Sequence, residues 1–438
     1  MYSRVATEAG VRLGDARRSR ASPRPAQDLK GPSLKLPSEV WALSLISFLS
    51  AAGMGLVAPV LPALAEEFGV GIAAMSVAVS GFAAARLVTT LALTRALRRL
   101  RLRPVLAAGL GFQAVTTVIS GLATDYTWFI VFRSLSGIGS AAFTISATAL
   151  LVALAPADRR GRAMSLYGSA SGMGIVGGPA IGGALGLAQP HLPLLVYGSA
   201  LGLGSLVTIF LLRRAGDLRT VDEVVTPLEG GGTGSAATPR RRGGAAVRLL
   251  RDPLFRVVLA CQVVQGWVHY GLRIAIIPSY LATLGHGLGF IGAGLSVAAA
   301  AQLASTSAGG SVSDRIGRKP ILLASCAVAL SGMTLFVFAT PAWVALLAFC
   351  AMGLSSGAQQ SSSSALLADS ANGRSAAAAG AFWMTFDVAG IVGPVVSGFL
   401  VETVGVPWAF GASGLVILVA FLVTVRMPRP PAAQAHTA

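Results

Sequence analysis

Apolar segments of about 20 residues recur along nearly the whole of this 438-residue chain, and short polar connections separate them. Each segment is long enough to cross the hydrocarbon core of a bilayer as a helix. Only 12% of the residues are charged, whereas a soluble protein carries about a quarter. In lipid a backbone must satisfy its own hydrogen bonds, which helices do within one segment. The pattern therefore predicts an all-α membrane protein.

Twelve such segments can be delimited, six on each side of a polar stretch. The first six lie at residues 40–63, 72–94, 104–123, 127–153, 162–187 and 191–212. The second six lie at residues 254–283, 287–310, 320–340, 343–367, 375–401 and 406–426. The predicted domains are a basic tail at 1–39, an N-terminal six-helix bundle at 40–212, a linker at 213–253, a C-terminal six-helix bundle at 254–426 and a tail at 427–438.

The basic residues are distributed unevenly along the chain. Of the 34 Lys and Arg, all but Arg86, Arg133 and Arg273 lie in alternate connections, at the segment ends that border them or in the tails. This is the positive-inside pattern, and it predicts a multi-pass protein of the cell membrane with the tails and the linker in the cytoplasm. The net charge of +17 is therefore explained by orientation toward anionic headgroups, and no nucleic-acid partner is expected.

The sequence offers little for covalent or metal chemistry. Cys261, Cys326 and Cys350 are too few and too widely spaced for a zinc site or a disulfide framework. No Gly-Lys dipeptide occurs, which argues against a nucleotide-binding P-loop. We therefore expect no enzyme activity, no metal and no cofactor.

The two sets of six segments are related by an internal repeat of 216 residues. Ala83–Leu87 corresponds to Ala299–Leu303, so that Arg86 aligns with Gln302. Each half has an even number of segments and so keeps the same orientation in the membrane. Parallel repeats of this kind predict two bundles related by a pseudo-two-fold axis along the membrane normal.

The fifth segment carries a glycine pattern that constrains its packing. Gly174, Gly178 and Gly182 recur every four residues, and on a helix they form one smooth face that allows close approach of another backbone. Pro179 removes a helical hydrogen-bond donor and favours a bend. The segment is predicted to be a close-packed, bent helix on which the first bundle pivots.

Three motifs carry a resemblance to a known family. Gly310–Lys319 lies between the eighth and ninth segments, Arg133–Gly139 lies in the fourth and Gly174–Gly183 lies in the fifth. The first two resemble the cytoplasmic loop signature and the Arg-containing fourth-span motif of the major facilitator superfamily. The third resembles the fifth-span motif of its proton-coupled drug exporters. The resemblance extends over nearly all of residues 40–426.

The loop signature contains residues that the resemblance implicates in conformational change. They are Gly310, Asp314, Arg315, Gly317 and Arg318. The first-half copy of the signature, Thr94–Arg103, departs from the pattern. By the repeat, Arg98 replaces the Asp and Arg101 replaces the turn Gly. We therefore expect conformational gating on that side of the membrane to be weaker, or to be carried by Asp314 alone.

Ionisable side chains inside the segments are costly unless they are paired or face water. Asp387 is the only carboxylate placed well inside a segment, and we expect Asp387 and Arg133 to couple transport to protons. The alternatives are that Asp387 is permanently paired with an arginine and that Arg133 is satisfied by backbone carbonyls or reaches outward. For Arg86, a functional role and a structural pairing stay equally open.

Several other side chains are candidates for the wall of a substrate cavity. They are Arg86, Gln265, His269, Arg273, Gln359, Gln360, Trp383 and Phe386. Gln265, His269 and Arg273 are spaced four residues apart and share one face of an α-helix. That face is expected to line a wet cavity, or else to form a packed hydrogen-bond network between helices. The aromatic residues would hold an apolar ligand or simply pack.

The resemblance implies a twelve-span secondary transporter that exports a small amphipathic compound or drug in exchange for protons. Its two bundles would rock around a central site, as a monomer in the lipid bilayer. The alternative is an importer or facilitator of a sugar or an organic anion, with Arg133 and Arg273 binding the anion. A non-transporting sensor would need a signalling domain, for which the tails and linker are too short and polar.

Overall fold

The computed structural model describes residues 36–428 except 97–99, 156–158, 212–250 and 371–375. Nearly all of the predicted basic tail and linker, together with Arg98, lies outside the described residues. The described part of the chain belongs to one compact unit, Leu36–Ala438.

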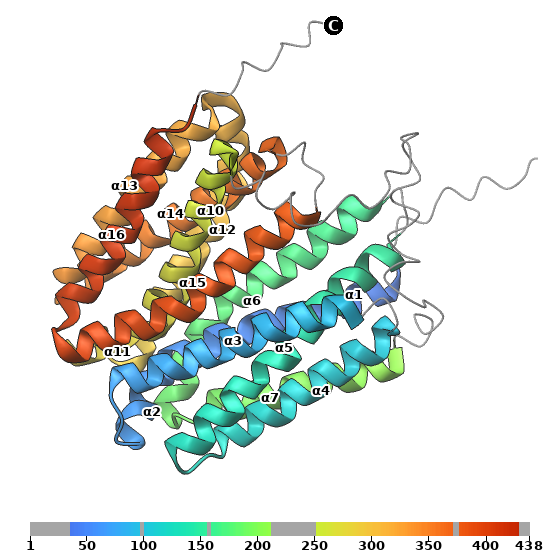
Figure 1. Ribbon diagram of the computed structural model, residues 1–438. Coiled ribbons are helices and arrows are strands. Elements are labelled where there is room, and N and C mark those ends of the chain that lie inside the picture. The colour runs from blue at the N-terminus through green and yellow to red at the C-terminus, as the bar shows by residue number, and fades with distance from the viewer. Residues whose placement is uncertain (1–35, 97–99, 156–158, 212–250, 371–375, 429–438) are drawn as a thin grey trace, which may run out of the picture. The chain divides into compact units, whose positions relative to one another are not determined.

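The described residues are helical, without strands, which confirms the all-α prediction (Figure 1). The first half contains α1 (Ser38–Val57), the short 3₁₀ turn η1 (Ala58–Val60), α2 (Leu61–Glu67), α3 (Ile72–Ala96), α4 (Leu102–Gly121), α5 (Tyr126–Leu154), α6 (Arg160–Ala188) and α7 (Leu192–Leu211). The second half contains α10 (Pro253–Gly266), the π-helix η4 (Trp267–Ile276), α11 (Ile277–Thr283), α12 (Leu288–Ile316), α13 (Arg318–Val337), α14 (Ala342–Asp369), α15 (Ala376–Thr403) and α16 (Val406–Val425).

Local sequence signals account for several of the helix boundaries. The Asp125 carboxylate accepts hydrogen bonds from the backbone N–H groups of the first turn of α5, and Asp252 does the same for α10. Pro253 occupies the first position of α10, where its missing N–H costs nothing. Gly317 separates α12 from α13 with a φ of +100°, a conformation that favours glycine.

Eleven helices in the described part of the chain are long and apolar enough to cross a membrane. One of them runs from Ser38 to Glu67 through α1, η1 and α2. The predicted span at 254–283 is not among the eleven, because a π-helical stretch, η4, interrupts its α-helix between α10 and α11. This segment is helical throughout and completes the predicted set of twelve.

The interruption is a π-helical stretch of ten residues, Trp267–Ile276. A π-helix closes its hydrogen bonds over five residues and is rare, and it is often found at functional sites. By the 216-residue repeat, the 3₁₀ turn at Ala58–Val60 aligns with the last three residues of this stretch. Prolines that align by the repeat, Pro62 and Pro278, come after both irregular segments. The two halves therefore share a break at the same depth.

Close backbone packing joins α1 and α6 within the first half. A Cβ atom added at Gly174, Gly178 or Gly182 would collide with a carbonyl oxygen of α1, those of Phe48, Ala52 and Leu56 respectively. Only glycine, which has no Cβ atom, allows the two backbones to lie this close. The helix α6 continues through Pro179 without a break between Arg160 and Ala188.

Two helix pairs connect the halves: α3 lies along α15, and α6 lies along α12 (Figure 1). The Ser80 hydroxyl of α3 donates a hydrogen bond to the Ile391 carbonyl of α15 at 2.8 Å. At the beginning of α3, the backbone N–H of Ala73 donates to the Glu402 carboxylate at 2.9 Å. These contacts pack the two halves against each other.

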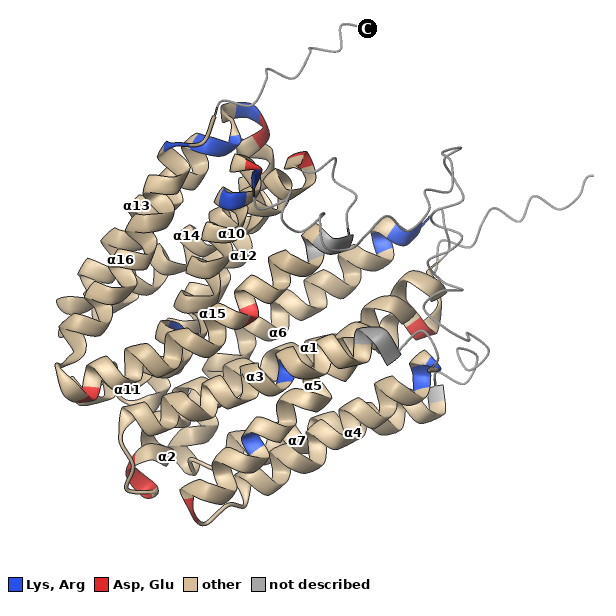
Figure 2. Ribbon diagram, viewed as in Figure 1, with Lys and Arg blue, Asp and Glu red and all other residues tan. Residues whose placement is uncertain are grey.

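The charges gather toward the ends of the helices. Figure 2 shows most of the described Lys and Arg toward one end and only a few charges in the helix middles. Those few in the middles include the arginines of α3, α5 and η4 and the aspartate of α15. The orientation of the helices in the membrane stays a prediction.

Candidate functional site

A cavity of about 410 Å³ lies between the two halves. Helices α1, α3, α5 and α6 of the first half and η4, α12 and α15 of the second contribute to its wall. Its volume falls within the range of small-molecule sites. The glycine-based packing of α1 against α6 positions two adjacent parts of that wall.

Three of the predicted residues that line the cavity have basic side chains: Arg86, His269 and Arg273. Among the described residues that line the cavity, none is an Asp or a Glu. The cavity wall is therefore a cationic one.

Hydroxyl and aromatic groups supply the remainder of the functional wall. The hydroxyl-bearing residues are Ser47, Ser50, Ser140, Thr144, Thr148, Tyr167 and Ser171. Phe143 and Trp383 add aromatic surface, and Trp383 is 54% exposed. This mixture of a largely apolar wall and a few polar groups is typical of sites for amphipathic compounds.

Arg86 connects the two halves beside the cavity. Its side chain contacts that of Tyr270 on η4 and interacts electrostatically with Asp387 on α15. Asp387 is only 6% exposed, whereas Arg86 is half-buried because it lines the cavity. The structure thus places the one deep carboxylate of the predicted site near Arg86.

Arg133 lies in different surroundings from those of Asp387. It is buried, its guanidinium lies 4.7 Å from the ring centre of Phe82, and it donates to the Ser136 hydroxyl at 3.3 Å. Tyr270 interacts electrostatically with Arg133, Arg86 and Asp387. Tyr270 therefore links Asp387 and Arg133, the two residues predicted to couple transport to protons. The sequence alone does not distinguish Tyr270 from a tyrosine that only packs.

Arg273 is buried at the cavity wall and has neutral partners. One terminal nitrogen donates to the side-chain oxygen of Gln302 at 2.5 Å, and the other donates to the Leu295 carbonyl at 3.5 Å. Gln302 is the repeat partner of Arg86. Arg86 of α3 and Gln302 of α12 therefore occupy equivalent positions, and each contacts a residue of η4.

Three predicted lining residues lie elsewhere in the described structure. Gln265 donates to the Ser356 carbonyl at 2.7 Å, and Gln359 contacts the sulfur of Cys326 at 3.7 Å; both border a separate small space within the second half. Gln360 is half-buried and donates to Ser364 at 3.4 Å. Their roles in a substrate cavity stay predictions.

The π-helix explains why Gln265 does not share a face with His269 and Arg273. Gln265 belongs to the regular helix α10, while the other two belong to η4. A wider turn holds more residues, so the spacing of four no longer aligns side chains across that boundary.

Phe386 supports the wall from behind. It is not among the lining residues, yet its ring lies 6.0 Å from that of His269, 5.7 Å from that of Tyr270 and 6.2 Å from that of Trp383, centre to centre. Phe386 therefore packs against His269, Tyr270 and Trp383, and two of these, His269 and Trp383, line the cavity.

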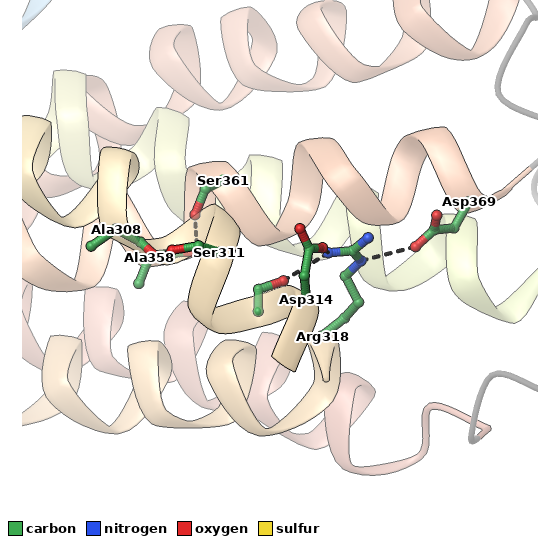
Figure 3. Close-up of polar contacts among 8 residues, drawn as sticks. Ala308, Ser311, Asp314, Arg318, Ala358, Ser361 and Asp369 are labelled. Atoms are coloured by element: carbon green, nitrogen blue, oxygen red, sulfur yellow. Dashed lines mark hydrogen bonds and ion pairs between the residues drawn. The ribbon is translucent and has the colours of Figure 1, made fainter. Parts of the chain in front are cut away.

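The predicted loop at Gly310–Lys319 is mostly helical, which corrects the sequence interpretation. The helix α12 extends to Ile316, and Gly317 alone separates it from α13. Arg318 pairs with Asp314 at 2.6 Å and with Asp369 of α14 at 2.9 Å (Figure 3). This network connects three helices of the same half.

Two arginines of the loop motifs lie outside this network and are exposed. Arg315 is exposed near the end of α12, and Arg101 is the exposed residue that precedes α4. In the second half, Arg318 rather than Arg315 carries the charge network.

Comparison with known proteins identifies a family and similar transporters. The family model of the Major Facilitator Superfamily matches residues 43–290 and 258–438. The tetracycline resistance protein, class D, of Salmonella ordonez is 24% identical over 409 residues, which cover 89% of this chain and 97% of that protein. Multidrug resistance protein 1 of Bacillus subtilis (strain 168) is 26% identical over 166 residues, covering 38% of this chain and 43% of that protein.

Solved structures share the fold. A bacterial homologue of the human lysosomal transporter Spinster, in an inward-facing and unoccupied conformation, aligns with a TM-score of 0.73 at 16% identity and covers 90% of this chain and 98% of its own. The nucleoside transporter NupG aligns with a TM-score of 0.69 at 14% identity, covering 89% and 99%.

Proposed function

Because this chain belongs to the Major Facilitator Superfamily and is a multi-pass membrane transporter of small molecules, we propose that it exports an amphipathic organic compound in exchange for protons. The proposal places it in the cell membrane as a monomer, with both termini in the cytoplasm. The near full-length similarity to a tetracycline resistance protein supports export. The predicted bundles, 40–212 and 254–426, are the units that would rock against each other.

The observation that carries the proton-coupling proposal is the approach of Arg86 to Asp387 across the two halves. A charged Asp387 attracts Arg86 and so favours contact of α3 with α15. Protonation removes that charge, weakens the attraction and frees the Arg86 guanidinium for the cavity. A single protonation event can thereby change both the packing of the halves and the charge presented to the substrate.

Arg133 acts in this proposal through Tyr270. Both arginines interact with that tyrosine, so a change at Asp387 alters the charge that Tyr270 and Arg133 experience. The role of Arg133 is then to position Tyr270 and to modulate proton release, while Asp387 carries the proton.

Transport into vesicles with an imposed proton gradient tests the proposal. The substrate should move opposite to the protons, and Asp387→Asn should abolish gradient-driven movement while sparing binding and exchange. Glu66→Gln is the matched control, because Glu66 is an exposed carboxylate of α2 that lies outside the cavity wall and the charge network of Arg318. Movement that ignores the gradient in the wild type would exclude proton exchange.

The second candidate is a facilitator of an organic anion. The two guanidinium groups in the cavity wall, without a carboxylate among the described lining residues, favour it. A facilitator would equilibrate its substrate with the same rate in the presence and absence of a proton gradient.

A further inference from the structure

We propose that Arg273, oriented by Gln302, is the binding site for an anionic group of the transported compound, which therefore carries a carboxylate or similar group on an apolar body. The proposal rests on the proposed function only in taking the cavity between the halves as the transport site. It specifies the class of substrate, which the family membership leaves open.

The charge balance of the cavity is the first argument. Arg86 has a compensating carboxylate nearby in Asp387, but within the described structure Arg273 has no acidic partner. Its side chain is only 6% exposed, so water compensates the charge poorly. A buried guanidinium with neutral partners alone is costly, and an anion at the cavity wall would offset that cost.

The hydrogen-bonding capacity of the site is the second argument. An arginine side chain has five N–H donors, and the two neutral acceptors use one donor on each terminal nitrogen. The Gln302 oxygen faces the guanidinium, which leaves its NH₂ group as a further donor. Donors without acceptors suit a carboxylate, which only accepts when it is ionised.

His269 lies close enough to both arginines of the cavity wall to interact with each of them. It lines the cavity and interacts electrostatically with both Arg273 and Arg86. An anion bound beside His269 therefore lies in the field of both guanidinium groups.

The wall of the cavity accounts for the apolar body. Met54, Phe143, Ile175, Ile274 and Trp383 line it together with the charged groups. A single inorganic ion would fill little of a volume of about 410 Å³ and would contact none of this apolar surface. A compound with an apolar part and one anionic group matches both features.

Calorimetric titration of the purified full-length protein with matched compounds tests the proposal. The probes share one ring system: naphthoate, its neutral amide naphthamide and the cationic naphthylmethylammonium, with chloride as an inorganic anion. We expect naphthoate to bind at least about tenfold more tightly than naphthamide, as a charge-assisted hydrogen bond predicts. The cation should bind most weakly.

Variants of Arg273 identify the residue responsible. Arg273→Gln should remove the preference for naphthoate over naphthamide, and Arg273→Lys should retain part of it because the charge remains. Arg256→Gln makes the same charge change on an exposed residue of α10 and should leave the preference intact. If a variant fails to fold, the affinities of the wild type for naphthoate and naphthamide still test the proposal.

Four results would overturn the proposal. The wild type could bind naphthoate and naphthamide equally, fail to bind naphthoate, or bind chloride alone, or Arg273→Gln could keep the preference unchanged. The proton-gradient experiment distinguishes failure of the anion-site proposal from failure of the proposed function. Anion preference without gradient-driven movement would refute proton exchange alone. Gradient-driven movement without anion preference would refute the anion site alone.

Discussion

The backbone N–H of Ala180 donates a hydrogen bond to the Ser296 hydroxyl oxygen at 2.9 Å, joining α6 of the first half to α12 of the second. Ala180 is next to Pro179, which has no N–H to donate. The repeat partner of Ser296 is Ser80, whose hydroxyl donates to the Ile391 carbonyl at 2.8 Å. A serine therefore bonds to the backbone of the neighbouring helix, close to a helical proline, both between α6 and α12 and between α3 and α15.

Ser296→Ala should shift the balance between conformations of the transporter. A hydrogen bond between membrane helices contributes about 0.6 kcal/mol on average, which corresponds to about a threefold change in an equilibrium constant. The shift should appear as altered accessibility of a cysteine introduced at the cavity wall. Ser331→Ala is the control, since Ser331 bonds only within its own helix among the described contacts. Equal effects of the two substitutions would contradict the prediction.

Gly178→Leu should block transport, whereas Gly177→Leu should be tolerated. A Cβ at Gly178 would collide with the backbone of Ala52, while one at Gly177 meets only Ile181 at 3.9 Å. Overpacking of this kind costs about 1–3 kcal/mol and separates α1 from α6. Transport rates and membrane insertion of both variants check the expectation. Normal transport by Gly178→Leu would show that the close packing is dispensable.

Two glycines of the loop signature should respond in opposite ways to alanine. Gly317 has a φ of +100°, so Gly317→Ala should destabilise the protein by about 1–3 kcal/mol. Gly310 lies within α12 with open space around its Cα, so Gly310→Ala should stabilise it by up to about 1 kcal/mol. Thermal unfolding in detergent measures both changes. A loss of stability in Gly310→Ala would argue against the helix extending to Ile316.

The electrostatic interaction of Arg86 with Asp387 should appear in a double-mutant cycle. Either Arg86→Gln or Asp387→Asn alone leaves a charge without its partner, so each should destabilise the protein more than the double substitution does. The expected interaction energy is about 0.5–3 kcal/mol, measured by thermal unfolding in detergent. The same cycle with Arg133 in place of Arg86 should give a smaller interaction energy, because Arg133 is linked to Asp387 through Tyr270. An interaction energy as large as that of Arg86 would contradict this.

The sequence predicts the architecture because lipid restricts the possible folds so severely. Apolar length and the 216-residue repeat were enough to predict two helical bundles, and the spacing of Gly174, Gly178 and Gly182 predicted a face for close packing. Apolar length did not predict where α12 ends. The apolar run stops near residue 310, whereas the helix continues to Ile316.

The site was less predictable than the architecture. Residue type and depth pointed to Arg86, His269, Arg273 and Trp383, all of which line the cavity. Which helix faces which is a tertiary property, so the approach of Arg86 to Asp387 and the separate position of Gln265 required the structure. The π-helical turn that separates Gln265 from His269 has no sequence pattern of its own.

That π-helix has a consequence for the direction in which side chains point. Each residue of a regular helix advances the phase by about 100°, and a π turn holds one residue more than an α turn. Rewinding η4, whose ten residues include Arg273, into a regular helix would therefore turn its side chains relative to those of α10. The winding of the backbone from Trp267 to Ile276 thus determines which side chains of this segment line the cavity.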